Sequence, residues 1–174
     1  MTTSDLTSSA AIRTRTMTAL FLAMAMALVV GTALGFEHIG GYIPCALCLE
    51  QRIPYYIGVP LMLVAALISR AGGPSWVVRG LLAVGGLLML YGLYLGVYHS
   101  GVEWHWWEGP ASCATSADAV TKDAGSLLGD LSSKKPPSCD SAALRVLGLS
   151  FAGWNVLASA ALAAIALRGA SIKG

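Results

Sequence analysis

Two cysteines and an arginine lie close together where the chain turns apolar. Residues 43–52 read IPCALCLEQR, so Cys45 and Cys48 form a C-x-x-C pair directly after Pro44, and Arg52 follows four residues after Cys48. If Pro44 takes the first position of a helix, both cysteines lie in its first turns, where free backbone amides favour a thiolate. Arg52 would share a helix face with Cys48, and its charge favours a thiolate further. The pattern predicts a reactive thiol pair.

The chain has two further cysteines, Cys113 and Cys139, and three interpretations of the four remain open. Structural disulfides suit Cys113 and Cys139 but not the C-x-x-C pair, because closing so small a loop removes little chain entropy. A zinc site is the second interpretation, although zinc ribbons use two tight pairs and this chain has one. Thiol–disulfide exchange between the two pairs is the third. We favour it, because C-x-x-C pairs are typical of redox-active sites.

Arg52 also has two interpretations. Its long side chain could carry the charge back to the lipid headgroups while the stem stays in apolar surroundings. Alternatively, it serves a site, since a cation in hydrocarbon is costly and therefore points to function.

Four apolar segments must position these residues. The 174 residues are 56% hydrophobic and 11% charged, far from the roughly 25% charged residues of soluble domains. Each segment has about twenty residues, enough for a helix to cross a ~30 Å hydrocarbon core, and none shows the alternation of barrel strands. We therefore expect an all-α integral membrane protein, a four-transmembrane-helix bundle with spans at about 17–36, 45–68, 76–98 and 147–167.

Basic residues near the span ends predict the orientation. They would all face the cytoplasm if there are four spans: Arg13, Arg15, Arg70, Arg79, Arg168 and Lys173. Both termini are then cytoplasmic, residues 1–12 form a disordered tail, and residues 13–174 form a single transmembrane domain. The outer loops are a short one at about 37–44 and a long second periplasmic loop at about 99–146. All four cysteines fall at or outside the periplasmic face of the membrane, an oxidising compartment in which disulfides persist.

Two details of this topology have alternatives. The first apolar segment could be a cleaved signal peptide, but it is longer than the usual core of 7–15 residues. Arg145 is a basic residue near the outer end of the last span, where the orientation rule disfavours it. We expect Asp140 or Ser141 to cap the start of a helix in which Arg145 faces the lipid headgroups. Within the spans, Gly31 and Gly35, like Gly92 and Gly96, have the four-residue spacing that lets membrane helices approach closely.

Repeated thiol oxidation needs an electron acceptor. The chain has no C-x-x-C-H haem motif and no GxGxxG dinucleotide motif. A membrane quinone remains as acceptor. It would reach Cys48 from within the bilayer, where Arg52 could donate a hydrogen bond to a quinone carbonyl.

Three stretches carry a resemblance to a known family: FEHIGGYIPCALCLEQR, YHSGVEWHWWEGPASC and CDSAALRVLGLSFAGW. With the order of the cysteines, they make the chain similar to the disulfide bond formation protein B family (DsbB). The resemblance implies an enzyme of the bacterial inner membrane that reoxidises a periplasmic DsbA-like thioredoxin-fold protein and passes electrons to ubiquinone or menaquinone. It implies lipid and quinone contacts, no metal site and no nucleic-acid partner.

The resemblance also implies residue roles. Cys113 would take the mixed disulfide with the partner, and Cys139 would be its disulfide mate. Cys45 would pass electrons inward, and Cys48 would face the quinone beside Arg52. His99 matches a family histidine near the quinone. Residues 114–138 match the family in little beyond their length.

Rival functions are a vitamin K epoxide reductase-like enzyme, a haem- or metal-binding tetraspan and a structural tetraspan. In the first, the C-x-x-C lies on the last span, whereas here it opens the second. The second would use His38, His99 and His105, which lie on one side of the membrane in this topology. The third would use the cysteines only to staple loops.

Overall fold

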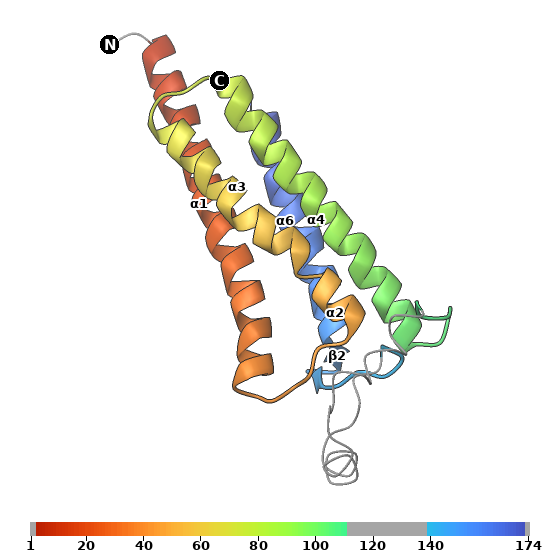
Figure 1. The fold of residues 1–174 in the computed structure, drawn as a ribbon. Helices are drawn as coiled ribbons and strands as arrows, with labels where there is room; N and C mark the ends of the chain where they lie inside the picture. Colours follow the sequence, from red (N-terminus) through yellow and green to blue (C-terminus); the bar gives the residue numbers. More distant parts are fainter. Residues whose placement is uncertain (1–2, 111–138, 173–174) are drawn as a thin grey trace, which may run out of the picture.

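The computed structural model describes the backbone of residues 3–110 and 139–172, and the side chains of residues 9–110 and 139–172 (Figure 1). The elements follow in the order α1 (Thr3–His38), α2 (Ala46–Glu50), α3 (Ile53–Arg70), α4 (Ser75–Glu103), β1 (Arg145–Val146), β2 (Leu149–Ser150) and α6 (Phe151–Ser171). In this part of the chain, four helical stretches are long and apolar enough to cross a membrane: Ser9–His38, Ala46–Arg70, Ser75–Glu103 and Phe151–Ser171. The predicted all-α membrane fold is confirmed.

The helices form a bundle around an apolar core. Helix α1 packs along α3, and α4 packs along α6. Their buried faces meet in large unbranched or γ-branched side chains, among them Leu22, Met26, Met62, Leu82 and Met89. The outward faces are also apolar, as in Met24, Leu28, Leu67 and Leu87. Helices that are hydrophobic all round are typical of membrane spans.

Glycines allow close packing at one helix pair and not at another. A Cβ added to Gly96 on α4 would lie 3.0 Å from Cγ2 of Val156 on α6, and one added to Gly92 would lie 3.1 Å from Oγ of Ser159. The expectation of close approach is met there. Gly31 and Gly35 have no atom within 4 Å of an added Cβ, so for that pair the expectation was wrong. No described residue packs closely against these two glycines of α1.

The second span is interrupted near its outer end. Helix α2 starts at Ala46 with Cys45 as its N-cap, and the chain turns at Gln51 before α3 begins. Pro54 lies in the first turn of α3 and has no N–H to continue the α2 ladder. The helix was expected to start at Pro44, but Cys45 Sγ accepts the Cys48 N–H and moves the start to Ala46.

Several boundaries differ from the sequence prediction. Helix α1 begins at Thr3, within the stretch that was predicted to be a disordered tail, and neither glycine nor proline interrupts residues 3–12. Helix α4 continues to Glu103, so the long outer loop begins at residue 104 instead of 99. The extension brings His99 inside the helix.

The last span also begins later than predicted. Asp140 and Ser141 do not start a helix, and residues 145–150 form a hairpin in which Arg145 pairs with Ser150. The hairpin turns at Leu147 and Gly148, both with positive φ, a backbone that glycine adopts freely. Ser150 then caps α6 by accepting the Gly153 N–H at 3.2 Å. The expected span of 147–167 is therefore shifted to Phe151–Ser171.

Candidate active site

The two cysteines of the C-x-x-C motif lie side by side as free thiols. Their sulfur atoms are 2.9 Å apart and share a hydrogen bond. The backbone N–H of Cys48 also points to Cys45 Sγ, at 3.4 Å. A disulfide has an S–S bond of about 2.05 Å, so only a small movement separates this dithiol from its oxidised form.

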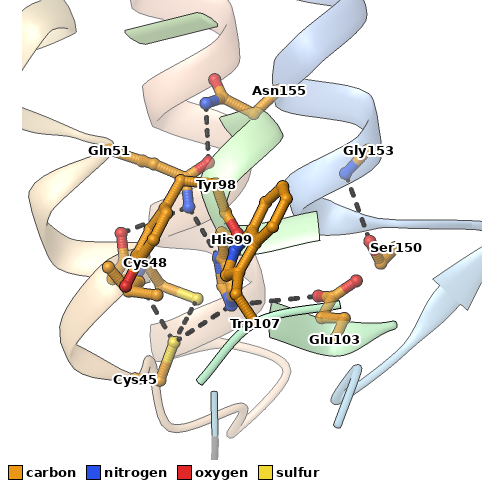
Figure 2. Close-up of polar contacts among 11 residues, drawn as sticks. Cys45, Cys48, Gln51, Tyr98, His99, Glu103, Trp107, Ser150, Gly153 and Asn155 are labelled. Carbon is orange, nitrogen blue, oxygen red and sulfur yellow. Dashed lines mark hydrogen bonds and ion pairs between the residues drawn. The ribbon is translucent and has the colours of Figure 1, made fainter. Parts of the chain in front are cut away.

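His99 of α4 lies beside Cys45 (Figure 2). Its Nε2 is 3.7 Å from Cys45 Sγ, and its Nδ1 is 2.7 Å from Nε2 of Gln51. Gln51 therefore donates an N–H to Nδ1, and the hydrogen of the neutral ring must be on Nε2. In this tautomer His99 presents an N–H to Cys45.

The orientation of Gln51 is itself fixed. Its Nε2 donates to the Leu47 carbonyl at 3.2 Å, and its Oε1 accepts from Nδ2 of Asn155 at 2.7 Å (Figure 2). Asn155 is held in turn, because its Nδ2 also donates to the Gly92 carbonyl and its Oδ1 accepts from the Tyr55 hydroxyl. Each amide thus has matching partners on both sides, and residues of four helices define the His99 tautomer.

These contacts favour a thiolate at Cys45, which lies just outside the second span. The hydrogen bond from the Cys48 side chain lowers the pKa of the Cys45 thiol well below its ordinary value. Burial opposes this effect, whereas the hydrogen bond from His99 lowers the pKa further. The sequence pointed to Arg52 as the group that favours a thiolate at Cys48, whereas the structure places the His99 ring and the Cys48 N–H beside Cys45.

Arg52 forms an ion pair with Glu37 from the end of α1. The two side chains are 11% and 25% exposed, so the charge of Arg52 stays among protein atoms beside a carboxylate. This contact argues against the alternative in which Arg52 reaches out to headgroups. An arginine has five N–H donors, so an arginine bound to one carboxylate can still donate to a ligand.

A cavity of about 430 Å³ lies between α1, the α2–α3 segment and α6. Its walls are mainly apolar, with the rings of Phe36 and Phe151 4.9 Å apart at one side. Cys48, Arg52 and Glu37 form a polar edge. This size and composition are typical of sites for small apolar ligands that carry a few polar atoms. Cys48 lines the cavity, while neither Cys45 nor His99 does.

Cys139 packs against the two cysteines of the C-x-x-C motif. It is disulfide-bonded and buried, and it belongs to one apolar cluster with Cys45, Leu47 and Val102. The structure thus brings Cys45, Cys48 and Cys139 into one region. Cys113 lies outside the described residues, so its predicted pairing stays a prediction.

The same residues could be considered for a metal. Cys45 Sγ, Cys48 Sγ and a ring nitrogen of His99 lie within 4.8 Å of one another. A histidine ligand, however, must offer a lone pair, and the Gln51 N–H at Nδ1 leaves Nε2 protonated. The hydrogen bonds thus suit a thiolate partner better than a metal. His38 and His105 are exposed and do not belong to this cluster.

Four polar residues of the site were not found from the sequence: Glu37, Gln51, Glu103 and Asn155. Glu103 is buried one turn beyond His99, with Oε1 3.9 Å from His99 Nε2 (Figure 2). The sequence did contain a signal for these residues: polar side chains in or beside apolar spans cost free energy and usually serve a function. Their partners, however, come from distant parts of the chain.

A family model described as disulfide bond formation protein DsbB matches residues 14–168, nearly the whole chain. The chain belongs to the DsbB family. Searches of curated proteins and of solved structures gave no match. Membership makes this DsbB-family chain a multi-pass membrane protein of disulfide-bond formation, with disulfide oxidoreductase activity.

Proposed function

We propose that this DsbB-family protein is a thiol oxidase that reoxidises a periplasmic DsbA-like thioredoxin-fold dithiol and passes the electrons to a membrane quinone. One observation carries the proposal: the C-x-x-C pair lies between two different surroundings. Both cysteines contact the cluster that contains Cys139, Cys45 as a buried member and Cys48 as a partly buried neighbour, but only Cys48 also lines the apolar cavity. Such a pair can accept electrons on one side and release them on the other.

The electron path follows from thiol exchange. The partner dithiol reduces the disulfide of Cys139, for which Cys113 is the proposed mate, and becomes a disulfide itself. The resulting loop dithiol then reduces a Cys45–Cys48 disulfide by thiolate attack. Each exchange transfers two electrons and leaves the number of disulfides unchanged. In the structure, Cys45 and Cys48 are thiols and Cys139 is disulfide-bonded, which corresponds to the stage before electrons leave the pair.

The cavity fits a quinone by its donor set and its walls. A bound quinone supplies the chemistry of accepting two electrons and two protons. Arg52 would donate a hydrogen bond to a carbonyl oxygen, and Glu37 would hold the guanidinium in place. Cys48 would be the thiol nearest the acceptor, while the apolar walls exclude water.

His99 acts on the cysteine pair from the other side. Its Nε2–H stabilises the thiolate of Cys45, since Gln51 fixes the ring tautomer. We therefore assign His99 to the thiol pair as a positioning residue. The family resemblance would have it contact the quinone, but His99 is not among the residues that line the cavity.

The proposed orientation places the cysteines on the periplasmic side and both termini in the cytoplasm, in the bacterial inner membrane. Figure 1 shows the start of α1, the end of α6 and the α3–α4 turn together at one end of the bundle, opposite α2 and β2. Arg13, Arg70 and Arg168 lie at that end and support its cytoplasmic assignment.

The test uses detergent-purified protein with a reduced thioredoxin-fold partner and a short-chain quinone, followed by quinone absorbance. Quinone should be consumed in proportion to partner disulfide formed. Cys45→Ser and Cys48→Ser should abolish turnover, and Arg70→Lys at the far end of α3 serves as the control. Full activity in Cys45→Ser, or no quinone consumption by the unmodified protein, would contradict the proposal.

A further inference from the structure

A buried arginine lies at the end of the bundle opposite the cysteines. Arg15 of α1 is 4% exposed, and its Nη2 donates to the Ile172 carbonyl at 2.8 Å. Its Nε is buried and has no hydrogen-bond partner among the described residues. Among the described side chains, the ion pairs are Arg52 with Glu37 and His99 with Glu103. Arg15 therefore has no carboxylate partner among these side chains. A buried cation is strongly disfavoured without an anion, so this position needs one.

A cavity lies beside Arg15, between α1 and the α3–α4 turn. Its volume is about 180 Å³, below the roughly 300 Å³ at which sites for small organic molecules begin. It therefore has room for one small anion or headgroup fragment. Besides Arg15, it is lined by small residues of the turn and its flanks, including Ser69, Gly72, Gly73 and Ser75.

The start of α4 contributes a second positive feature to this cavity. Helix α4 has 29 residues and begins at Ser75, which lines the cavity. Pro74 occupies the N-cap position and provides no side-chain hydrogen bond, so no side chain caps the first amides. Uncapped amides and the helix dipole make such an end favourable for anions. The unpaired guanidinium and the helix start thus meet at one small cavity.

We propose that this cavity binds the phosphate group of an anionic phospholipid. Arg15 lies two residues before Met17, where the apolar run begins, so the cavity is at headgroup depth. Basic pockets between membrane helices on the cytoplasmic side bind anionic headgroups, and the arginine fork matches phosphate oxygens. Exposed Arg70 adds positive charge nearby. The proposal does not depend on the redox function.

Native mass spectrometry of the delipidated full-length protein tests this site. Phosphatidylglycerol or phosphatidylcholine is added back, and retained lipid is measured. The unmodified protein should retain phosphatidylglycerol in preference to phosphatidylcholine. Arg15→Gln should weaken that retention about tenfold, as expected for one charge-assisted hydrogen bond. The matched control Arg13→Gln removes an exposed charge two residues earlier and should retain the lipid.

A second variant keeps the test valid if Arg15→Gln does not fold. Ser75→Asp places a carboxylate at the start of α4, where it supplies the missing anion. This variant should melt at a higher temperature than the unmodified protein and lose its preference for phosphatidylglycerol. Equal retention by Arg15→Gln and Arg13→Gln, or unchanged retention in Ser75→Asp, overturns the proposal. Stabilisation by inorganic phosphate that equals the effect of phosphatidylglycerol overturns the lipid as occupant and leaves a free-anion site.

Discussion

Cys45 and Cys48 have different neighbours, although only two residues separate them. The sulfur of Cys45 faces donors, namely the Cys48 N–H and the imidazole of His99. Cys48 instead borders an apolar cavity whose polar edge contains Arg52. One thiol is thus stabilised as an anion near the loop cysteine cluster, and the other is placed next to the proposed acceptor. For the proposed electron path, this asymmetry would set the direction of flow through the pair.

The first prediction concerns the pKa of Cys45. Since Cys48 is the main cause of the lowered pKa and His99 a smaller one, Cys48→Ala should raise it more than His99→Phe. A lowered pKa keeps the thiolate populated as pH falls below the ordinary value of about 8.5, so both variants should alkylate more slowly in mildly acidic buffer. Iodoacetamide labelling against pH, read at Cys45 by mass spectrometry, measures this.

Ser100→Ala is the control for this experiment. Ser100 follows His99 on α4, and its buried Oγ has no hydrogen-bond partner among the described residues. The labelling midpoint should therefore stay where it is in the unmodified protein. A larger shift in His99→Phe than in Cys48→Ala would contradict the order of the two contributions.

The second prediction concerns Arg52. Arg52→Lys keeps the charge but loses the planar fork that can bind Glu37 and a carbonyl together. The KM for quinone should rise about tenfold, the effect of losing one hydrogen bond to a charged group. The KM for the thioredoxin-fold partner should not change, because the proposed site of that partner is the Cys113 and Cys139 pair and not the cavity. Steady-state kinetics with each substrate varied separately measures both constants, and a rise in the partner KM alone would argue against a quinone role.

The break between α2 and α3 is the element that creates the site. It turns Gln51 toward His99 and leaves Arg52 at the start of α3, beside Glu37. Pro54 explains why the ladder stops there, because it has no N–H.

The hydropathy of the sequence was enough to predict the transmembrane helices. The four spans, the C-x-x-C pair and Arg52 at the mouth of the second span follow from composition and spacing alone. The hairpin at residues 145–150 did not, because its apolar residues resemble the start of a span. Glu37 and Asn155 were missed for another reason: their partners are far away in the sequence, and only packing of the bundle brings them together.

The third prediction tests the α4–α6 contact. Gly96→Leu should destabilise the protein by about 1–3 kcal/mol, since the new side chain meets Val156 and Asn155 where an added Cβ already lies 3.0–3.2 Å away. Gly31→Leu is the matched control, because nothing lies within 4 Å of its added Cβ. Thermal unfolding in detergent compares the two. Equal melting temperatures would show that this contact adapts without cost.

At the scale of the whole molecule, one polar network crosses the apolar bundle. It runs from Cys45 through His99 and Gln51 to Asn155, and then to Tyr55. The segments involved are α3, α4, α6, the residue that caps α2 and the turn between α2 and α3. Because each amide is fixed by partners on another helix, the arrangement at Cys45 depends on the relative positions of all of them. Helix packing and thiol chemistry are thereby coupled.

The fourth prediction tests this coupling through Asn155, which touches neither cysteine. Asn155→Leu removes the donor to Gln51 Oε1, so only the Leu47 carbonyl still orients the Gln51 amide, and the tautomer of His99 is less firmly fixed. The pKa of Cys45 should rise toward the ordinary value, and its alkylation should slow in mildly acidic buffer. Ser159→Ala removes a hydroxyl that contacts Tyr55 and Asn155 Oδ1 but leaves the Asn155–Gln51 bond, so it controls for general loosening of the bundle. A Cys45 labelling profile that is unchanged in Asn155→Leu, or shifted equally in both variants, would show that the helices hold His99 without this network.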